Sequence, residues 1–77
     1  MPAPVNWSRE ARRILRAEIA LKDIGFKELS RALEAEGVYV DAKVLATKIS
    51  RGTFSFAFFL QCMRALKIDV ICLNPPR

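Results

Sequence analysis

The sequence has no histidine and only two cysteines, Cys62 and Cys72, which excludes several classes of site. Zinc sites that combine cysteine with histidine cannot be assembled from these residues. A disulfide framework is also disfavoured, which indicates a reducing compartment. Because no histidine is present to activate a thiol, we expect both cysteines to be small apolar packing residues rather than nucleophiles.

Long hydrophobic runs and catalytic motifs are missing as well. No segment approaches the roughly 20 apolar residues that a membrane helix needs, and the N-terminus lacks the charged-then-apolar order of a signal peptide. We therefore expect a cytoplasmic protein with no membrane partner. The sequence has no nucleophile paired with a base, no glycine-rich phosphate loop and no spaced pair of carboxylates. It predicts a protein that is not an enzyme and that uses no cofactor or metal.

Acidic residues are scarce relative to basic ones, with 8 Asp and Glu against 13 Lys and Arg, a net charge of +5. The excess lies in the second half, because residues 37–77 carry six basic and two acidic side chains. A basic surface on so small a chain favours a polyanionic partner. The 77 residues, 52% of them hydrophobic, predict a single domain over 1–77, with a flexible arm at 1–5 and a flexible tail at 74–77.

Hydrophobic periodicity and helix-capping residues predict helices over about residues 7–22, 26–36 and 42–51, and a fourth that follows an N-cap at Ser55. We expect Gly25 to end the first helix in a left-handed conformation and Gly37 to end the second. Residues 68–73 are mostly β-branched and favour an extended or strand-like tail. The fold class predicted is all-α, a compact bundle of four to five short helices, with a short C-terminal strand as an open option.

The first predicted helix is amphipathic. Its expected apolar side consists of Trp7, taken as a core anchor, with Ala11, Ile14 and Leu21. The opposite side carries a stripe of four arginines: Arg9, Arg12, Arg13 and Arg16. Such a stripe suits contacts with phosphates or with an acidic protein groove, and an ordinary solubilising surface is the alternative.

The third predicted helix has the clearest division of faces. Asp41 stands at its N-cap, Gly52 closes it, and Leu45 and Ile49 face inward. The opposite arc presents long donors and small hydroxyls: Lys43, Thr47, Lys48, Ser50 and Arg51. These side chains suit base edges and phosphates in a DNA major groove, although a merely solvated face has the same composition.

Four phenylalanines lie within six residues and cannot all face one side of a helix. The spacing places Phe56 and Phe59 in the core, together with Cys62, Met63 and Leu66. Phe58 and Phe54 are then expected at or near the surface, either packed against the first helix or the tail, or in a dimer contact. The candidate interface residues are Phe54, Phe58, Val70, Ile71 and Leu73.

From Gly25 to Asp69 the order of these signals resembles the Cro and phage-repressor (XRE-like) type of helix-turn-helix domain. The residues that carry the resemblance are Gly25 and Phe26, then Leu29, Ser30 and Leu33, then Ile49, Ser50, Arg51 and Gly52, and finally Ala65, Leu66 and Lys67. The chain also looks like a group of small, uncharacterised bacterial domains with the same Lys-Ile-Ser-Arg-Gly run. The resemblance implies a helix-turn-helix fold with the third helix as the recognition helix.

Two functions are therefore expected. The first is a bacterial or phage-type transcription regulator, a repressor-like homodimer that binds duplex DNA with residues 41–51 and supports that contact with the arginine stripe. The second is a protein-interaction module, antitoxin-like or an accessory subunit, that uses its apolar C-terminal third to bind a partner or a second copy.

Overall fold

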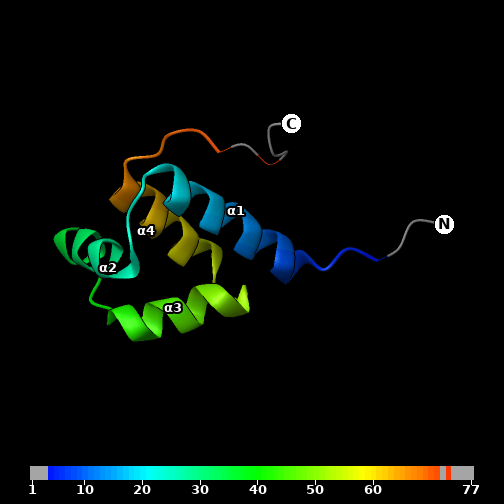
Figure 1. The fold of residues 1–77 in the computed structure, drawn as a ribbon, viewed down its shortest axis with the longest axis horizontal. Helices are drawn as coiled ribbons and strands as arrows, with labels where there is room; N and C mark the ends of the chain where they lie inside the picture. The colour runs from blue at the N-terminus through cyan, green and yellow to red at the C-terminus, as the bar shows by residue number, and fades with distance from the viewer. Residues whose placement is uncertain (1–3, 72, 74–77) are drawn as a thin grey trace.

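The computed structural model describes residues 4–71 and Leu73. Over these residues it confirms the all-α class, with four helices (Figure 1): α1 (Trp7–Leu21), α2 (Phe26–Ala35), α3 (Ala42–Arg51) and α4 (Phe56–Leu66). No strand occurs in this described part, so residues 68–71 form an irregular tail rather than a strand. The predicted flexibility of residues 1–3 and 74–77 and the predicted packing of Cys72 fall outside it. None of the described helices combines the length and apolarity needed for a bilayer crossing.

The start of α1 is fixed by Asn6, whose side-chain oxygen accepts a hydrogen bond from the Arg9 amide at 3.0 Å. The end of α1 differs from the prediction. Gly25 is extended (φ −97°, ψ 179°) and serves as the N-cap of α2, where its amide donates to the Glu28 carboxylate. The left-handed residue after α1 is instead Asp23, with φ 53°. The predicted left-handed cap at Gly25 is therefore wrong, because Asp tolerates this conformation and reverses the chain earlier.

The connection between α2 and α3 spans residues 36–41 and is held on both sides. Gly37 is left-handed at φ 82°, as its predicted role in ending α2 requires. The Ser30 hydroxyl donates to the Val40 carbonyl at 2.6 Å, which ties the end of the connection to α2. The Asp41 side chain then accepts from the Lys43 amide at 3.1 Å and caps α3.

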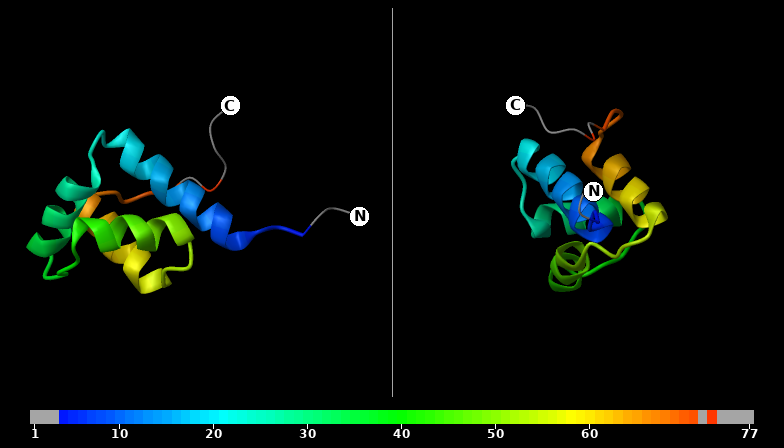
Figure 2. Two further views of the ribbon diagram at one scale, coloured as in Figure 1. Left: turned by 60° about the horizontal axis from the view of Figure 1, so that its bottom comes forward. Right: turned by 90° about the vertical axis from the view of Figure 1, so that its right-hand side faces the viewer.

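One core joins all four helices. Each contributes fully or almost fully buried apolar side chains, namely Leu15 and Ile19, Leu29 and Leu33, Leu45 and Ile49, and Phe58, Cys62, Met63 and Leu66. Helix α2 packs against both α3 and α4, and α1 packs against α3. In the right-hand view of Figure 2, α3 forms one corner of the bundle, with α1 and α4 above it. One side of α3 is therefore left open.

The predicted inner side of α1 is wrong. Trp7 is 74% exposed and Leu21 is also exposed, whereas Leu15 and Ile19 are buried. The apolar arc of this helix is wider than its partners can cover, and α1 turns the Leu15 and Ile19 edge of that arc to the core. Trp7 and Leu21 are the first and last residues of the helix.

The predicted roles of two phenylalanines in α4 are exchanged. Phe58 is buried, with 5% of its surface exposed, and Phe56 is 72% exposed. Phe58 stands one turn before Cys62 and so shares its buried side of α4. Phe56 is the first residue of α4 and, two residues before Phe58, points to the opposite side of the helix. The expectation of a surface Phe58 is therefore wrong, as is that of a core Phe56.

Candidate nucleic-acid interface

Helix α3 presents the arc that the sequence predicts. All five of its candidate residues are exposed: Lys43, Thr47, Lys48, Ser50 and Arg51. Directly beneath them Leu45 and Ile49 are completely buried, so the helix is anchored by its inner face. Helix α3 contains three cations and no acidic residue, and its Asp41 cap lies at the far end from Arg51. The outward face is therefore cationic and rigidly held.

The hydrogen bonds of this arc differ from residue to residue. The Thr47 hydroxyl donates to the Lys43 carbonyl within the helix, at 3.2 Å. The Lys48 ammonium lies 4.7 Å from the centre of the Phe58 ring, in a cation–π contact. Among the described residues, the side chains of Lys43 and Arg51 form no hydrogen bond or ion pair. These two cations are free to meet an external anion.

Sequence reasoning missed one residue of the arc. Val44 is 56% exposed and lies on the α3 surface between Arg51 and Lys48. These three residues help to line a hollow of about 370 Å³. Its walls are Val44, Thr47, Lys48, Arg51, Thr53 and Phe54. The signal was available, because on the helical wheel Val44 falls inside the arc of charged residues rather than beside Leu45.

The arginine stripe of α1 divides into two pairs. Arg12 donates to the Ser50 carbonyl at 3.1 Å and so links α1 to the last turn of α3. Arg13 donates to the Glu10 carboxylate and to the Leu73 carbonyl, the latter at 3.0 Å. Arg9 and Arg16 are exposed. Two of the four arginines therefore serve internal contacts, and two remain on the surface.

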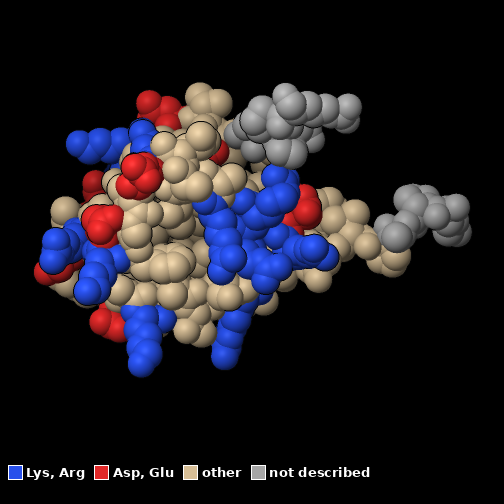
Figure 3. Space-filling model, viewed as in Figure 1, with Lys and Arg blue, Asp and Glu red and all other residues tan. Residues whose placement is uncertain are grey.

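Arg16 joins the arc of α3. A groove of about 480 Å³ between these helices is lined by Arg16, Phe26, Ala46, Thr47, Ser50 and Arg51. The close approach of the two helices depends on Gly52, since a Cβ at that position would lie 2.0 Å from the Ser8 carbonyl oxygen. Figure 3 shows Lys and Arg side chains gathered over α1 and the adjacent end of α3, with others projecting from the edge where α3 lies.

Most of the candidate interface residues lie away from the arc of α3, although Phe54 also borders the hollow on α3. Val70 and Leu73 are exposed, Phe54 and Ile71 are half-buried, and the buried Phe58 cannot take part in an external contact. Three of these residues, Phe54, Ile71 and Leu73, line an apolar groove of about 330 Å³ between α1 and the start of α4. The other residues that line it are Ala11, Ile14, Ser55, Phe56 and Phe59. We call this the α1–α4 groove. Ser55 is the only polar residue among those that line it.

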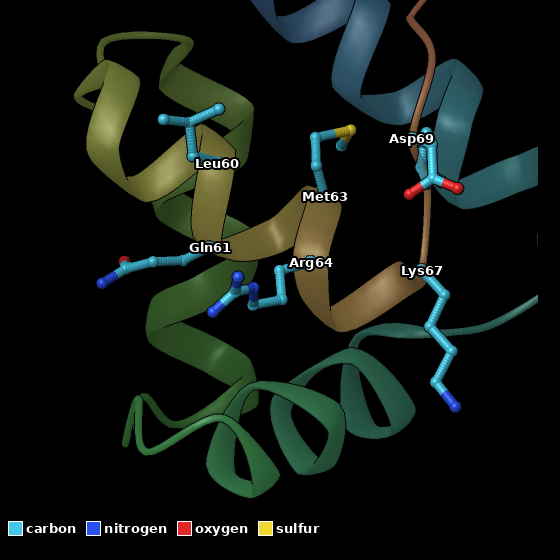
Figure 4. Close-up of a pocket in the computed structure, with 7 residues that line it drawn as sticks. Leu60, Gln61, Met63, Arg64, Lys67 and Asp69 are labelled. Carbon is cyan, nitrogen blue, oxygen red and sulfur yellow. The ribbon is translucent and has the colours of Figure 1, made fainter.

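Two further features offer no comparable site. Burial raises the pKa of the Cys62 thiol to about 12, an effect that the nearby charge of Lys48 partly offsets. The thiol therefore stays protonated near neutral pH and is a poor nucleophile. The large hollow of about 730 Å³ beside the end of α4 is shown in Figure 4. There Gln61 and Arg64 point away from Asp69, so its polar groups do not converge.

Comparison with known proteins places most of the chain in one family. No curated protein and no solved structure matches the chain. Residues 7–71, which span all four helices and the start of the tail, match the family described as a domain of unknown function, DUF6471. The chain belongs to this family.

Proposed function

We propose that this domain is a DNA-binding regulator that contacts the major groove of duplex DNA with the exposed arc of α3. One observation carries the proposal: the five side chains predicted from sequence, three of them cationic, share one open face of a capped helix that is anchored on the other side by the fully buried Leu45 and Ile49. A major groove about 12 Å wide accepts an α-helix. Lysine and arginine on such a helix reach guanine acceptors and phosphates.

The arrangement of α2 and α3 supports a helix-turn-helix reading of this face. In such units the second helix enters the major groove and the first crosses the DNA backbone. Helix α2 packs against α3 and is tied to it through Ser30 and Val40. The connection over residues 36–41 is longer than the usual tight turn, but Ser30 ties its end to α2 and Asp41 caps the start of α3 directly after it.

The proposal gives the arginines of α1 separate roles. Arg16 lies in the groove beside Thr47 and Arg51, so it contacts a phosphate that flanks the bases under α3. Arg9 is exposed in the first turn of α1 and contacts the backbone farther along. Arg12 and Arg13 act indirectly, because their guanidinium groups donate hydrogen bonds to the backbone carbonyls of Ser50 and Leu73.

The test is a fluorescence-anisotropy titration of the full chain against mixed-sequence duplex DNA at two salt concentrations. We expect binding that weakens steeply with salt, with a slope of about 0.9 for each phosphate neutralised. The control variant Lys22→Ala removes an exposed cation at the C-terminal end of α1, and it should bind as the wild type does. Absence of salt-sensitive binding at micromolar protein would end the proposal.

The α1–α4 groove favours a second function, the holding of a protein partner or of a second copy. Its apolar lining, together with the exposed Trp7 and Phe56, is typical of a contact surface. A second copy would suit DNA binding, since two recognition helices at a fixed spacing read two half-sites. Light scattering of Phe56→Glu against the wild type tests self-association through the groove, and an unchanged monomer in both would remove the second copy as its occupant.

A further inference from the structure

We propose that α3 recognises thymine in its DNA site through the methyl groups of Val44 and Thr47. The inference rests on the proposed function and adds to it the base that the arc prefers. The major-groove edge of thymine carries a 5-methyl group, which apolar side chains and the threonine methyl contact. Cytosine and the purines offer no such group in the grooves.

The two side chains stand together on the helix. Val44 and Thr47 are three residues apart, so their side chains are neighbours on one face. Both line the hollow on α3, where Lys48 and Arg51 are their charged neighbours. The exposed arc therefore contains a small apolar patch beside its cationic side chains.

The hydroxyl of Thr47 is already engaged. It donates its only hydrogen to the Lys43 carbonyl at 3.2 Å, so it has no donor left for a base acceptor. What Thr47 can offer to the outside is its methyl group and an acceptor oxygen. Thr47 therefore offers a base its methyl group, as Val44 does, and no hydrogen-bond donor.

The fold itself gives no reason for Val44. The side chain is 56% exposed and does not belong to the core. A β-branched residue is also a poorer helix former than alanine. Its stiff χ1 angle does, however, hold its methyl groups in one position, which favours a contact that needs a fixed geometry.

The experiment compares thymine with deoxyuridine, which differs only by lacking the 5-methyl group. Duplexes are enriched from a randomised library on the wild-type protein, and the winning sequence is made once with thymine and once with deoxyuridine at every thymine position. We expect the deoxyuridine duplex to bind about fourfold more weakly for each methyl group contacted. Val44→Ala should lower this ratio and leave the part that the Thr47 methyl contributes, and because alanine is the better helix former the variant should stay folded.

Substitutions of Thr47 separate the methyl group from the hydroxyl. Thr47→Val keeps the methyl and should keep the preference for thymine, whereas Thr47→Ser keeps the hydroxyl and should reduce it. Lys43→Ala is the matched control, because it should weaken binding to both duplexes equally. Equal binding of the two duplexes by the wild type, or enrichment of sequences without thymine, would overturn the inference alone. If no duplex is bound at all, the proposed function fails and this inference fails with it.

Discussion

Two surfaces of this small bundle differ in how they relate to the core. The arc of α3 is exposed and cationic, and it lies above the completely buried Leu45 and Ile49. The α1–α4 groove is concave and apolar, and it is lined partly by residues of the tail. Both are held by the same four helices, which meet in one core.

The two surfaces differ in whether their side chains also stabilise the fold. In the arc, Lys43, Val44 and Arg51 contribute nothing to the core, so a change there should alter binding and leave stability intact. In the groove, Phe54 and Phe59 pack against the core while also forming the surface. Their rings are stacked, with centres 6.4 Å apart. A change there should alter stability and association together.

The largest effect is expected at Gly52, where the end of α3 lies against α1. Gly52 is left-handed at φ 69°, and a Cβ there would lie 2.0 Å from the backbone oxygen of Ser8. Gly52→Ala combines backbone strain with a clash that no side-chain rotation relieves, so we expect a loss of about 4 kcal/mol or more. Thermal unfolding followed by circular dichroism measures it.

Gly37→Ala is the matched control for this substitution. Gly37 is also left-handed, at φ 82°, but nothing lies within 4 Å of its added Cβ. It should therefore lose only the conformational part, about 1 kcal/mol. Equal losses at both glycines would mean that the contact between α1 and α3 is not close.

The next largest effect compares two neighbouring phenylalanines of α4. Phe58→Ala should destabilise the fold by about 3 kcal/mol, because it empties a buried site. Phe56→Ala removes an exposed ring and should change stability by less than about 0.5 kcal/mol. Urea denaturation of both variants provides the measurement. Similar losses in the two would contradict the placement of Phe58 in the core and of Phe56 on the surface.

Helix α3 was predictable from sequence because its local signals agree with its packing. Asp41 caps it, Gly52 ends it, and apart from the exposed Val44 its polar and apolar residues form two arcs. A helix with one narrow apolar stripe can bury only that stripe. Both its ends and the exposure of its five candidate residues therefore followed from the residues alone.

Helices α1 and α4 carry more apolar residues than the core can accept, and this is why their inner faces were mistaken. Trp7, Ile14 and Ile19 of α1 all fit an apolar arc, and only contact with the other helices decides which edge is buried. In α4, the sequence likewise leaves open whether Phe56 or Phe58 is buried, and contact with the other helices decides it. The α1–α4 groove, which depends on tertiary contacts, could not be derived from periodicity.

A smaller effect should appear in DNA binding and not in stability. The double variant Lys43→Ala, Arg51→Ala removes two exposed cations of the arc that have no partner among the described residues. We expect affinity for duplex DNA to fall about tenfold at moderate salt, and the salt slope to fall by about 1.8. Anisotropy titrations over a salt series measure both quantities. Loss of affinity with an unchanged slope would assign these cations a role other than phosphate neutralisation.

The smallest effect distinguishes two arginines that sit one turn apart on α1. Arg12→Met removes the hydrogen bond to the Ser50 carbonyl and should destabilise the fold by about 1 kcal/mol. Arg16→Met removes a side chain with no hydrogen bond among the described residues, so stability should be unchanged and DNA binding should weaken. Parallel denaturation and anisotropy measurements on both variants decide the matter. If Arg16→Met is the less stable of the two, the stripe supports the fold rather than the contact with DNA, because a residue that only binds an external anion cannot stabilise the free protein.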